Sequence, residues 1–418
     1  MLVINPKRIN EEIEFKPFWY NYYAGYSHTF THKIICSSGL SEGSIILDPW
    51  NGAGTTTLVS SINGYKSIGV DLNPVMKVIA KAKQSTKVDI PEVKMIFSRI
   101  EQENCFFGQE KDYLNVWFTQ SSVNSIRNIE SSILGGVEYK STIEKIDSLS
   151  SAQCIMYTAL FNCLRKYLSG FIPSNPTWIK KPKIDSDKID ICWSEFKMKY
   201  SLELNEMMNG LSIANHDWPE NMAHINVGSS SNLKVEDSSI DFVLTSPPYC
   251  TRIDYGVATL PELSILCVKG EPELDAIRRS LMGTTTVPKD IKGKERDLGT
   301  VCLDFLEKVK SHKSKASSTY YYKNLVQYFF DLKLSINEIA RVLKKKSKFI
   351  CVVQDSYYKD LHCDLSSIVI EMAGMKNLLI CESVEFESKN NMANLNTKAK
   401  KYRKKSKAFE NVLIFEKS

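Results

Sequence analysis

Short apolar runs that end in turn-forming residues recur along the chain, and they predict the strands of an α/β sheet. The first run, residues 45–48, leads into a Gly-Ala-Gly sequence at 52–54, after which small polar residues open a helix. The next run, residues 67–70, ends at Asp71 and is followed by a helical pattern over residues 74–83. This order of strand, glycine-rich turn, helix and strand predicts the start of a doubly wound sheet.

The alternation of strand and helix resumes in the second half of the chain and predicts a seven-stranded sheet in total. The later strands are expected at residues 224–229, 240–244, 349–355, 378–384 and 411–415. The last two would form a β-hairpin connected through residues 388–408, and helices are expected at 31–37 and 320–343. We therefore predict an α/β, Rossmann-like fold that is doubly wound and ends in a β-hairpin.

Two long inserts interrupt this alternation. Residues 89–221 are rich in helical patterns, for example over 152–168, and predict a mainly helical insert. Residues 251–318 have an irregular pattern and form a second insert. Residues 1–88 and 222–418 would together form the main domain, and a chain of 418 residues has room for more than one compact unit.

The composition is that of a globular protein, with 43% hydrophobic residues. No apolar run reaches the roughly 18 residues that a membrane span requires, so no membrane association is expected. Residues 1–14 lack the basic start and apolar core of a secretory signal, and we expect a cytoplasmic protein. The eleven cysteines include no C-x-x-C pair and the six histidines show no paired spacing, which predicts reduced thiols and no metal site.

The positive charge of the chain is concentrated near its C-terminus. The formal net charge is +6, whereas residues 388–408 alone carry eight basic residues and no acidic one. A loop that contacts phosphates would have this composition, and a solvated surface loop is the alternative. The basic run at 341–348 is instead expected to end an amphipathic helix, where cations favour the helix dipole, and to precede a strand.

The glycine-rich turn after the first strand has the features of a ligand-binding loop. Gly52 and Gly54 allow positive φ and a close approach of the backbone to a ligand. Asp48 would repel a pyrophosphate, and the third glycine of the dinucleotide fingerprint and the Lys-Ser/Thr of a P-loop are absent. A ligand with positive charge suits this carboxylate better. Asp71, 17 residues after Gly54, is placed to accept a hydrogen bond from a ribose hydroxyl, and it is also a candidate N-cap of the helix at 74–83.

A second candidate site follows the apolar run at 240–244. The sequence Ser246-Pro247-Pro248-Tyr249 is rigid, because proline fixes φ and removes the backbone N–H donor. Its serine oxygen and carbonyls would accept hydrogen bonds from an amino group on a planar ring, on which the tyrosine would stack. Taken alone, the same sequence also suits a rigid turn with a half-buried tyrosine.

Together these segments resemble the S-adenosylmethionine-dependent DNA amino-methyltransferases of bacterial modification systems. Residues 48–56 resemble the family's cofactor loop, Asp-Pro-Phe-x-Gly-x-Gly-Thr-Thr, with Trp50 in place of phenylalanine. Residues 246–249 resemble its catalytic motif, in which Asp, Asn or Ser precedes Pro-Pro-Tyr. Many relatives have Gly-Asp where this chain has Gly228-Ser229, and Asp237 is no evident substitute for that acid.

The resemblance implies a class I methyltransferase fold, S-adenosyl-L-methionine as cofactor and double-stranded DNA as substrate. A cognate restriction endonuclease or defence-system protein is a candidate partner. The helical insert is then the candidate target-recognition region, and the insert at 251–318 the candidate DNA-contacting region.

The same resemblance implies three sets of site residues and no metal ligand. The catalytic residues would be Ser246, Pro247, Pro248 and Tyr249. The cofactor-binding residues would be Tyr26, Asp48, Pro49, Gly52, Gly54, Thr55, Thr56, Asp71, Leu72, Asn73 and Ser229. The DNA-binding residues would be Lys180, Lys181, Arg252, Arg278, Arg279, Lys398, Lys400, Lys401, Arg403, Lys404 and Lys405.

The identity of the methylated group is left open by the motif. Serine before Pro-Pro-Tyr favours N4 of cytosine, and N6 of adenine is the alternative. Enzymes of the same fold also methylate RNA bases or protein amides, and a DNA-binding module without activity is a further alternative. Cys250 is expected to be structural, because covalent attack on cytosine in relatives uses a cysteine directly after proline, and here Tyr249 intervenes.

Overall fold

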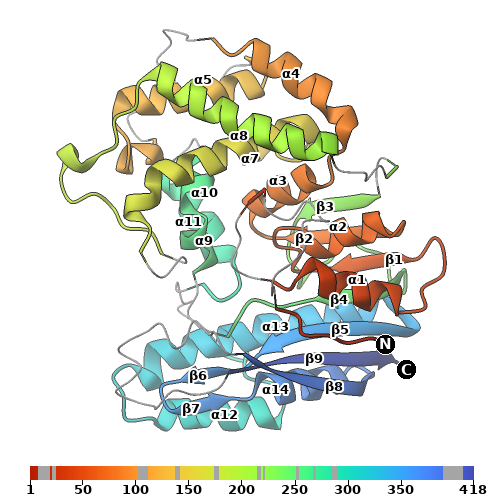
Figure 1. Ribbon diagram of the computed structural model, residues 1–418. Helices are drawn as coiled ribbons and strands as arrows, with labels where there is room; N and C mark the ends of the chain where they lie inside the picture. Colours follow the sequence, from red (N-terminus) through yellow and green to blue (C-terminus); the bar gives the residue numbers. More distant parts are fainter. Residues whose placement is uncertain are drawn as a thin grey trace.

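A seven-stranded sheet with helices on both faces carries a helical lobe at one side (Figure 1). The computed structural model describes residues 1–7, 19–20, 25–101, 112–136, 142–173, 178–213, 218–219, 222–250, 254–266, 270–284, 290–388 and 408–418. Within this part of the chain, no helix is long and apolar enough to cross a membrane.

The strand order is β3-β2-β1-β4-β5-β9-β8. The strands are β1 (Ile45–Asp48), β2 (Lys66–Asp71), β3 (Ala223–Val227), β4 (Ile240–Thr245), β5 (Leu343–Gln354), β8 (Leu378–Ser388) and β9 (Ala408–Lys417). The first five in spatial order are parallel, and β9 lies antiparallel between β5 and β8. This arrangement confirms the predicted Rossmann-like fold of class I methyltransferases with its final hairpin.

Two hydrophobic cores cover the two faces of this sheet. On one face, Phe30 and Ile34 of helix α1 (His28–Cys36) pack with inward residues of β4 such as Phe242. The other face is covered by α13 (Tyr322–Val342) and α14 (Leu365–Gly374), together with α12 (Thr300–Ser311). A short hairpin of β6 (Ser356–Tyr358) and β7 (Leu361–Cys363) extends this side. The remaining helices next to the sheet are α2 (Thr55–Ile62) and α3 (Pro74–Lys83).

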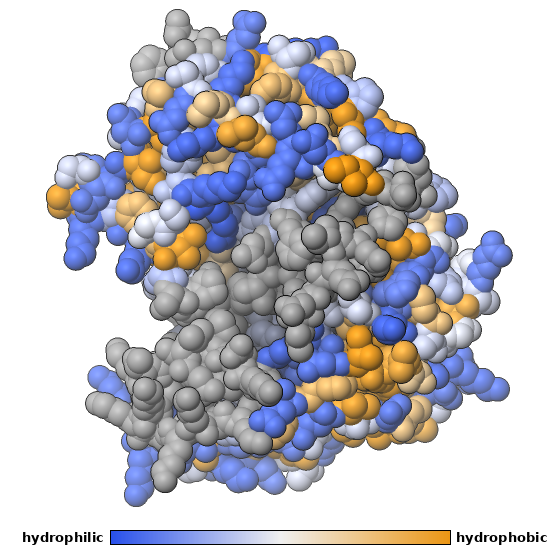
Figure 2. All heavy atoms as spheres, in the orientation of Figure 1, coloured by the Kyte–Doolittle hydropathy of each residue, from blue (hydrophilic) through white to orange (hydrophobic). Residues whose placement is uncertain are grey.

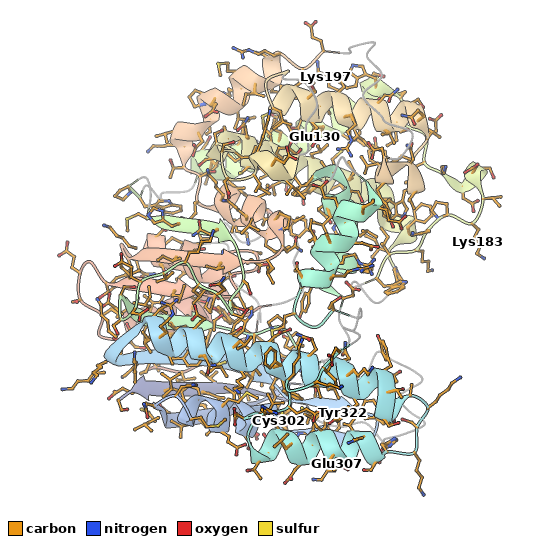
Figure 3. All side chains as sticks on the ribbon, turned by 180° about the vertical axis from the view of Figure 1, so that it is seen from behind. Glu130, Lys183, Lys197, Cys302, Glu307 and Tyr322 are labelled. Atoms are coloured by element: carbon orange, nitrogen blue, oxygen red, sulfur yellow. The ribbon has the colours of Figure 1, made fainter. Side chains whose placement is uncertain are left out.

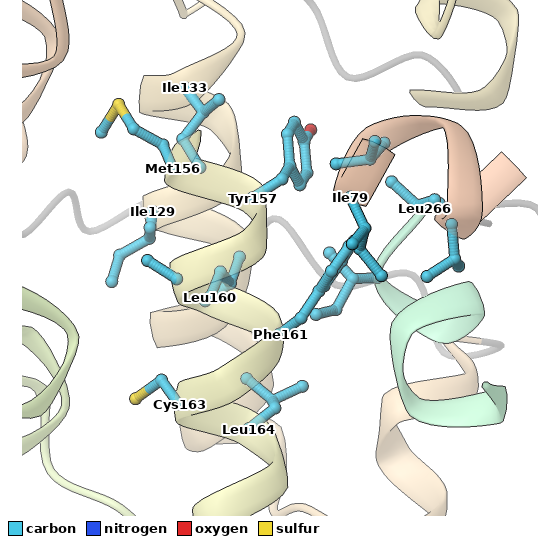
Figure 4. Close-up of a cluster of buried hydrophobic side chains, with 14 of the residues drawn as sticks. Ile79, Ile129, Ile133, Met156, Tyr157, Leu160, Phe161, Cys163, Leu164 and Leu266 are labelled. Atoms are coloured by element: carbon cyan, nitrogen blue, oxygen red, sulfur yellow. The ribbon is translucent and has the colours of Figure 1, made fainter. Parts of the chain in front are cut away.

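The helical lobe has its own hydrophobic core around α7, in which Leu160, Phe161 and Leu164 meet Ile79 of α3 and Leu266 of α10 (Figure 4). Its α-helices are α4 (Ile90–Ser98), α5 (Gln120–Ile133), α6 (Thr142–Lys145), α7 (Ser151–Tyr167), α8 (Trp193–Ile213), α9 (Tyr255–Ala258), α10 (Leu260–Leu266) and α11 (Glu271–Ser280). Short 3-10 turns lie at Lys87–Asp89, Tyr113–Val116, Leu168–Phe171 and Asp185–Asp187, and a π-helical turn at Ser317–Tyr321. Because α3 also contacts the sheet, it connects the helical lobe to the sheet domain.

Several helix and strand boundaries differ from those predicted from the sequence. The helix expected at 31–37 begins at His28, because the Ser27 hydroxyl caps it by accepting from the Phe30 N–H (3.0 Å). The basic run at 341–348 lies mostly in a strand, because the helix ends at Val342 and β5 begins directly at Leu343. Charged side chains obscured that strand start, since its first residues lie at the rim of the sheet.

The segment from Cys250 to Ser318 is not irregular. In its described residues it contains α9 to α11, whose apolar positions are buried in the core of the helical lobe. It also contains α12, whose apolar positions are buried in a core of the sheet domain. The helices α9 and α10 were missed because a run of four or seven residues is too brief to establish a helical period, whereas the longer α11 and α12 were not recognised.

Candidate active site

A pocket lies at the carboxyl ends of the parallel strands, where a doubly wound sheet binds its ligand. The loops after β1, β2, β3 and β4 line it, together with α9 and residues before α1 and after α11. Its lining residues are Gly25, Tyr26, Asp48, Pro49, Trp50, Asn51, Gly52, Ala53, Thr55, Asp71, Leu72, Gly228, Ser230, Ser246, Pro247, Pro248, Tyr249, Tyr255, Leu281 and Met282.

Asp48, at the end of β1, is held by hydrogen bonds from several parts of the chain. Its Oδ1 accepts from the Thr245 hydroxyl (2.5 Å) and the Trp50 N–H (3.1 Å). Its Oδ2 accepts from the hydroxyls of Thr56 (2.6 Å) and Tyr26 (3.2 Å). Burial raises the pKa of Asp48, and these hydrogen bonds counteract the rise. The carboxylate is thus fixed in orientation and offers the pocket its charge.

Asp71, at the end of β2, is the second carboxylate of the pocket. Its Oδ2 accepts from the N–H of Gly52 (2.9 Å), which ties the glycine-rich loop to β2, and its Oδ1 accepts from the N–H of Asn73 (2.8 Å). Burial raises the pKa of Asp71 to about 6. The N-cap of α3 is Asn73, whose Oδ1 accepts from the Val75 N–H (3.1 Å), so Asp71 is not the cap that the sequence allowed. Asp71 therefore keeps acceptor capacity toward the pocket.

The glycine-rich loop needs its glycines for packing as much as for ligand approach. Gly54 has φ +81, and a Cβ there would lie 2.7 Å from the Cβ of Ala80 in α3. Gly69 in β2 leaves room for the amide of Asn51, which would lie 2.5 Å from a Cβ at that position. These close approaches place α2, α3 and the loop tightly around the pocket.

The Ser-Pro-Pro-Tyr loop follows β4 directly and is held from both sides by tyrosine hydroxyls. The Tyr328 hydroxyl, from α13, donates to the Pro248 carbonyl (2.7 Å). The Tyr255 hydroxyl, from α9, accepts from the Tyr249 N–H (3.1 Å). The Ser246 hydroxyl and the Pro247 carbonyl have no hydrogen-bond partner among the described residues, and both residues line the pocket. Among the described residues, these two acceptors of the loop are therefore open, while the Pro248 carbonyl is occupied.

Comparison with curated proteins finds a consistent set of relatives. The chain is 25% identical over 395 residues to the type II methyltransferase M.AvaI of Nostoc sp., which covers 85% of this chain and 77% of that protein. It is 24% identical to the type II methyltransferase M.BsoBI of Geobacillus stearothermophilus, over 65% of this chain and 56% of that protein. It is also 24% identical to M.MvaI of Kocuria varians, over 78% of this chain and 73% of that protein. The chain is a homologue of the type II methyltransferases.

This relationship confirms the family resemblance that the motifs carry. The match to M.BsoBI spans little more than half of that protein, 56% of its length. No model of a protein family matches the chain. A solved S-adenosylmethionine-dependent methyltransferase from Methanosarcina mazei aligns over 92% of this chain and 96% of its own, with 10% identity and a TM-score of 0.30.

The cofactor of the type II methyltransferases, S-adenosyl-L-methionine, fits the charges of the pocket. Among the described residues that line it are the carboxylates Asp48 and Asp71, and no lysine or arginine. Such a pocket suits a ligand with an ammonium and a sulfonium group and disfavours a pyrophosphate. No group of three or more His, Cys, Asp or Glu in the described part of the chain is arranged to hold a metal ion.

Most of the expected cofactor-binding residues line the pocket of this methyltransferase homologue, and four do not. Thr56 and Asn73 act behind the wall, where they hydrogen-bond Asp48 and cap α3. Gly54 packs against α3, and the Ser229 hydroxyl bonds that of Ser231 (2.8 Å). Gly228 and Ser230, on either side of Ser229, line the pocket. Asp237 lies away from it, paired with Arg341 (2.5 Å).

Sequence reasoning missed several residues of the wall. Tyr255, Leu281 and Met282 come from the second insert, where no motif marks them, and Gly25 precedes α1. Trp50 and Asn51 sit inside the recognised cofactor loop, and the loop's spacing could have included them. The others reach the pocket only through the packing of distant segments.

The four expected DNA-binding residues that the structure describes lie on two separate segments. Lys180 and Lys181 are exposed on the segment between α7 and α8. Arg278 pairs with the buried Asp254 (3.1 Å), which caps α9, so it stabilises the second insert, whereas Arg279 is exposed on α11. Outside the described residues lie Arg252, Lys398, Lys400, Lys401, Arg403, Lys404 and Lys405.

Proposed function

We propose that this protein is a site-specific DNA methyltransferase that modifies the exocyclic amine of a base flipped out of the duplex, and that the base is cytosine, methylated at N4. The observation that carries the proposal is the pair of open acceptors in the Ser-Pro-Pro-Tyr loop. Ser246 and Pro247 line the same pocket as Asp48 and Asp71. An exocyclic amine carries two N–H groups, so two neighbouring acceptors match it.

The residues of the loop would orient the amine for attack. When bound, S-adenosylmethionine supplies a methyl group activated by its sulfonium. Ser246 and Pro247 would accept hydrogen bonds from both N–H groups and so draw the nitrogen lone pair out of conjugation with the ring. Tyr249 would stack on the flipped base. The hydroxyl of Tyr328 occupies the Pro248 carbonyl, so Pro247 is the carbonyl left for the amine. Catalysis would rest on this positioning and would need no covalent nucleophile.

The cofactor would be held between the ends of β1 and β2. Asp71 would accept from the ribose hydroxyls, since it lines the pocket and its carboxylate can accept more than the two hydrogen bonds from Gly52 and Asn73. The fixed carboxylate of Asp48 would stabilise the positively charged ammonium and sulfonium groups of the cofactor. Tyr26 orients Asp48 and lines the pocket beside it.

The choice of cytosine rests on the neutral acceptor Ser246 and on the resemblance of its motif to N4-cytosine enzymes. N6-adenine methylation would use the same pocket and the same loop. By the same resemblance, we expect a cognate restriction endonuclease or another defence-system protein to act at the same DNA site.

The test is transfer of tritiated methyl from S-adenosylmethionine to genomic DNA, total RNA and a protein extract in parallel, followed by nucleoside analysis. N4-methylcytosine is the expected product, and N6-methyladenine would replace the proposed base. Label confined to RNA or protein would refute the DNA assignment.

The loop itself is tested with Ser246→Ala. Removing one hydrogen bond to the amine should lower the rate of methyl transfer by about fivefold, because a hydrogen bond contributes about 1 kcal/mol. Cofactor affinity should be unchanged. Ser98→Ala, which alters an exposed serine on α4, is the matched control. Equal rates in the two variants would show that Ser246 does not touch the amine.

A further inference from the structure

A cluster of lysines surrounds the turn between α12 and α13. We call it the lysine surface, and it consists of Lys308, Lys310, Lys313, Lys315 and Lys323. Residues 308–324 contain these five lysines and no Asp or Glu, which gives this stretch a formal charge of +5 against +6 for the whole chain. The charge run is shorter than the C-terminal one and is interleaved with hydroxyl and aromatic residues, so it did not stand out in the sequence.

Most of these lysines are exposed and are not neutralised. Lys308, Lys310, Lys313 and Lys315 are exposed, and in the described part of the chain Lys308, Lys313 and Lys315 make no ion pair. The Lys310 ammonium lies 5.3 Å from the ring centre of Tyr322. Exposed cations close together repel one another, and Glu307 before Lys308 and Asp360 beside His312 offset only part of this charge, so a multivalent anion would stabilise the surface.

The turn that carries the lysines is held by a chain of hydrogen bonds. The His312 ring bonds the Ser314 hydroxyl (2.9 Å) and Asp360 (2.8 Å). The Ser317 hydroxyl bonds those of Ser314 (2.7 Å) and Tyr358 (2.6 Å), which anchors the turn to the β6–β7 hairpin. The lysines thus project from a fixed backbone, and binding would cost little ordering of the chain.

The backbone of this turn adds exposed hydroxyls to the lysines. Ala316 has φ +63 and starts the π-helical turn Ser317–Tyr321. Ser318 and Thr319 lie on this turn and are exposed. Hydroxyl groups beside lysines are typical of surfaces that contact phosphate oxygens.

The lysine surface is coupled to the catalytic loop through α13. This helix begins at Tyr322, and its Tyr328 donates to the Pro248 carbonyl. Six residues of helix span about 9 Å, which equals the rise of about three base pairs of duplex. The start of α13, beside the lysine surface, therefore lies only a few base-pair rises along the helix from the residue that holds the catalytic loop.

The helical lobe carries a lysine on the same side of the molecule as the start of α13. Lys183, in the segment between α7 and α8, and Tyr322, at the start of α13, lie on the same side of the molecule, in the upper and lower lobes (Figure 3). The lysine surface, which lies next to Tyr322 in the chain, therefore belongs to the sheet domain on the side where Lys183 projects from the helical lobe. On the opposite side, hydrophilic side chains lie on both lobes among the described residues (Figure 2).

We propose that the lysine surface binds the phosphate backbone of duplex DNA about three base pairs or more from the flipped base. This inference rests on the proposed function, and it adds which surface of the sheet domain holds the duplex. Contacts of this kind position the DNA and carry no sequence information, so they strengthen binding to all duplexes alike.

The test compares two triple variants from which equal charge is removed. Lys308→Gln/Lys313→Gln/Lys315→Gln removes the unpaired part of the lysine surface. Lys66→Gln/Lys345→Gln/Lys376→Gln is the control, because these exposed lysines lie around the amino ends of the parallel strands, opposite the pocket. Binding of the full-length protein to a duplex of random sequence is measured between about 0.05 and 0.2 M salt.

We expect the plot of log affinity against log salt to be less steep by about two to three units for the lysine-surface variant, because each phosphate that a lysine neutralises contributes about 0.9 to the slope. The control variant should keep the slope of the unaltered protein, and both should keep its thermal stability. Equal slopes in all three proteins, or an equal change in both variants, would overturn the proposal. The proposal would also be overturned if the lysine-surface variant bound RNA more weakly but bound duplex DNA as the unaltered protein does.

Methyl transfer to DNA by the unaltered protein is measured alongside. Its absence would refute the proposed function, while the slopes still decide whether the lysine surface binds duplex DNA. Transfer to DNA with unchanged slopes would leave the function standing and refute only the surface.

Discussion

Tyr328 should set the position of the catalytic loop although it does not touch the substrate. Its hydroxyl donates to the Pro248 carbonyl at 2.7 Å, and burial raises the pKa of Tyr328 well above its ordinary value, so the hydroxyl stays protonated. Tyr328→Phe keeps the ring in the core of α13 and removes only this hydrogen bond. The Pro248 carbonyl would then be free to compete with Pro247 for the amine.

The expected decrease in rate follows from the energy of one hydrogen bond. Such a bond contributes about 0.5–1.5 kcal/mol, so the rate of methyl transfer should fall by about 2- to 13-fold if the loop needs it in the transition state. The free energy of unfolding should fall by about 1 kcal/mol. Affinity for S-adenosylmethionine should be unchanged, because Tyr328 is not part of the pocket wall.

The assay is single-turnover methyl transfer at saturating cofactor and DNA, which separates chemistry from binding. Tyr322→Phe is the matched control, since it removes a hydrogen bond to Glu295 (2.9 Å) from the same helix, away from the loop. The control should lose stability and keep its rate. A Tyr328→Phe rate equal to that of the control, or a rise in the cofactor KM alone, would refute a positioning role for Tyr328.

Three further predictions concern the cofactor loop and the helical lobe. Burial raises the pKa of Asp71 to about 6. Cofactor affinity, measured by calorimetry, should therefore fall as the pH drops from about 7 to about 5, because the carboxylate that accepts the ribose hydroxyls becomes protonated. Asp71→Asn should remove this pH dependence. Gly54→Ala should lower the free energy of unfolding in urea by about 1–3 kcal/mol, and by more than Gly64→Ala, because both have positive φ but only Gly54 lacks room for a Cβ. Arg127→Met should lower it by about 3–5 kcal/mol, because it leaves two carboxylates buried without their cation; a decrease below about 1 kcal/mol would contradict this.

The helical lobe shows where sequence patterns end and packing takes over. The periodicity of residues 152–168 predicted α7 to within one residue at each end, because a 17-residue helix repeats its apolar face several times. The buried network of Arg127 with Asp112 and Glu130, which also donates to the carbonyls of Ser264 and Ile265, had no sequence signal. Charged residues are expected at the surface, and only the packing of α5 against α10 makes them a buried, fully paired group.

The local parts of the site could be predicted from the sequence alone. The glycine-rich turn, the acids at the ends of β1 and β2 and the Ser-Pro-Pro-Tyr loop are specified by backbone chemistry, since glycine permits positive φ and consecutive prolines fix a rigid turn. These features, in this order, also carried the family and the fold class.

The support of these parts depends on the three-dimensional packing of the chain. Thr245 meets Asp48 across 197 residues of chain, and Tyr328 meets Pro248 across 80. The lysine surface is connected to the catalytic loop because α13 begins beside it and holds the loop through Tyr328. Contacts between distant residues depend on which faces of the elements pack together, and a single sequence shows which faces are apolar but not which partner each will find.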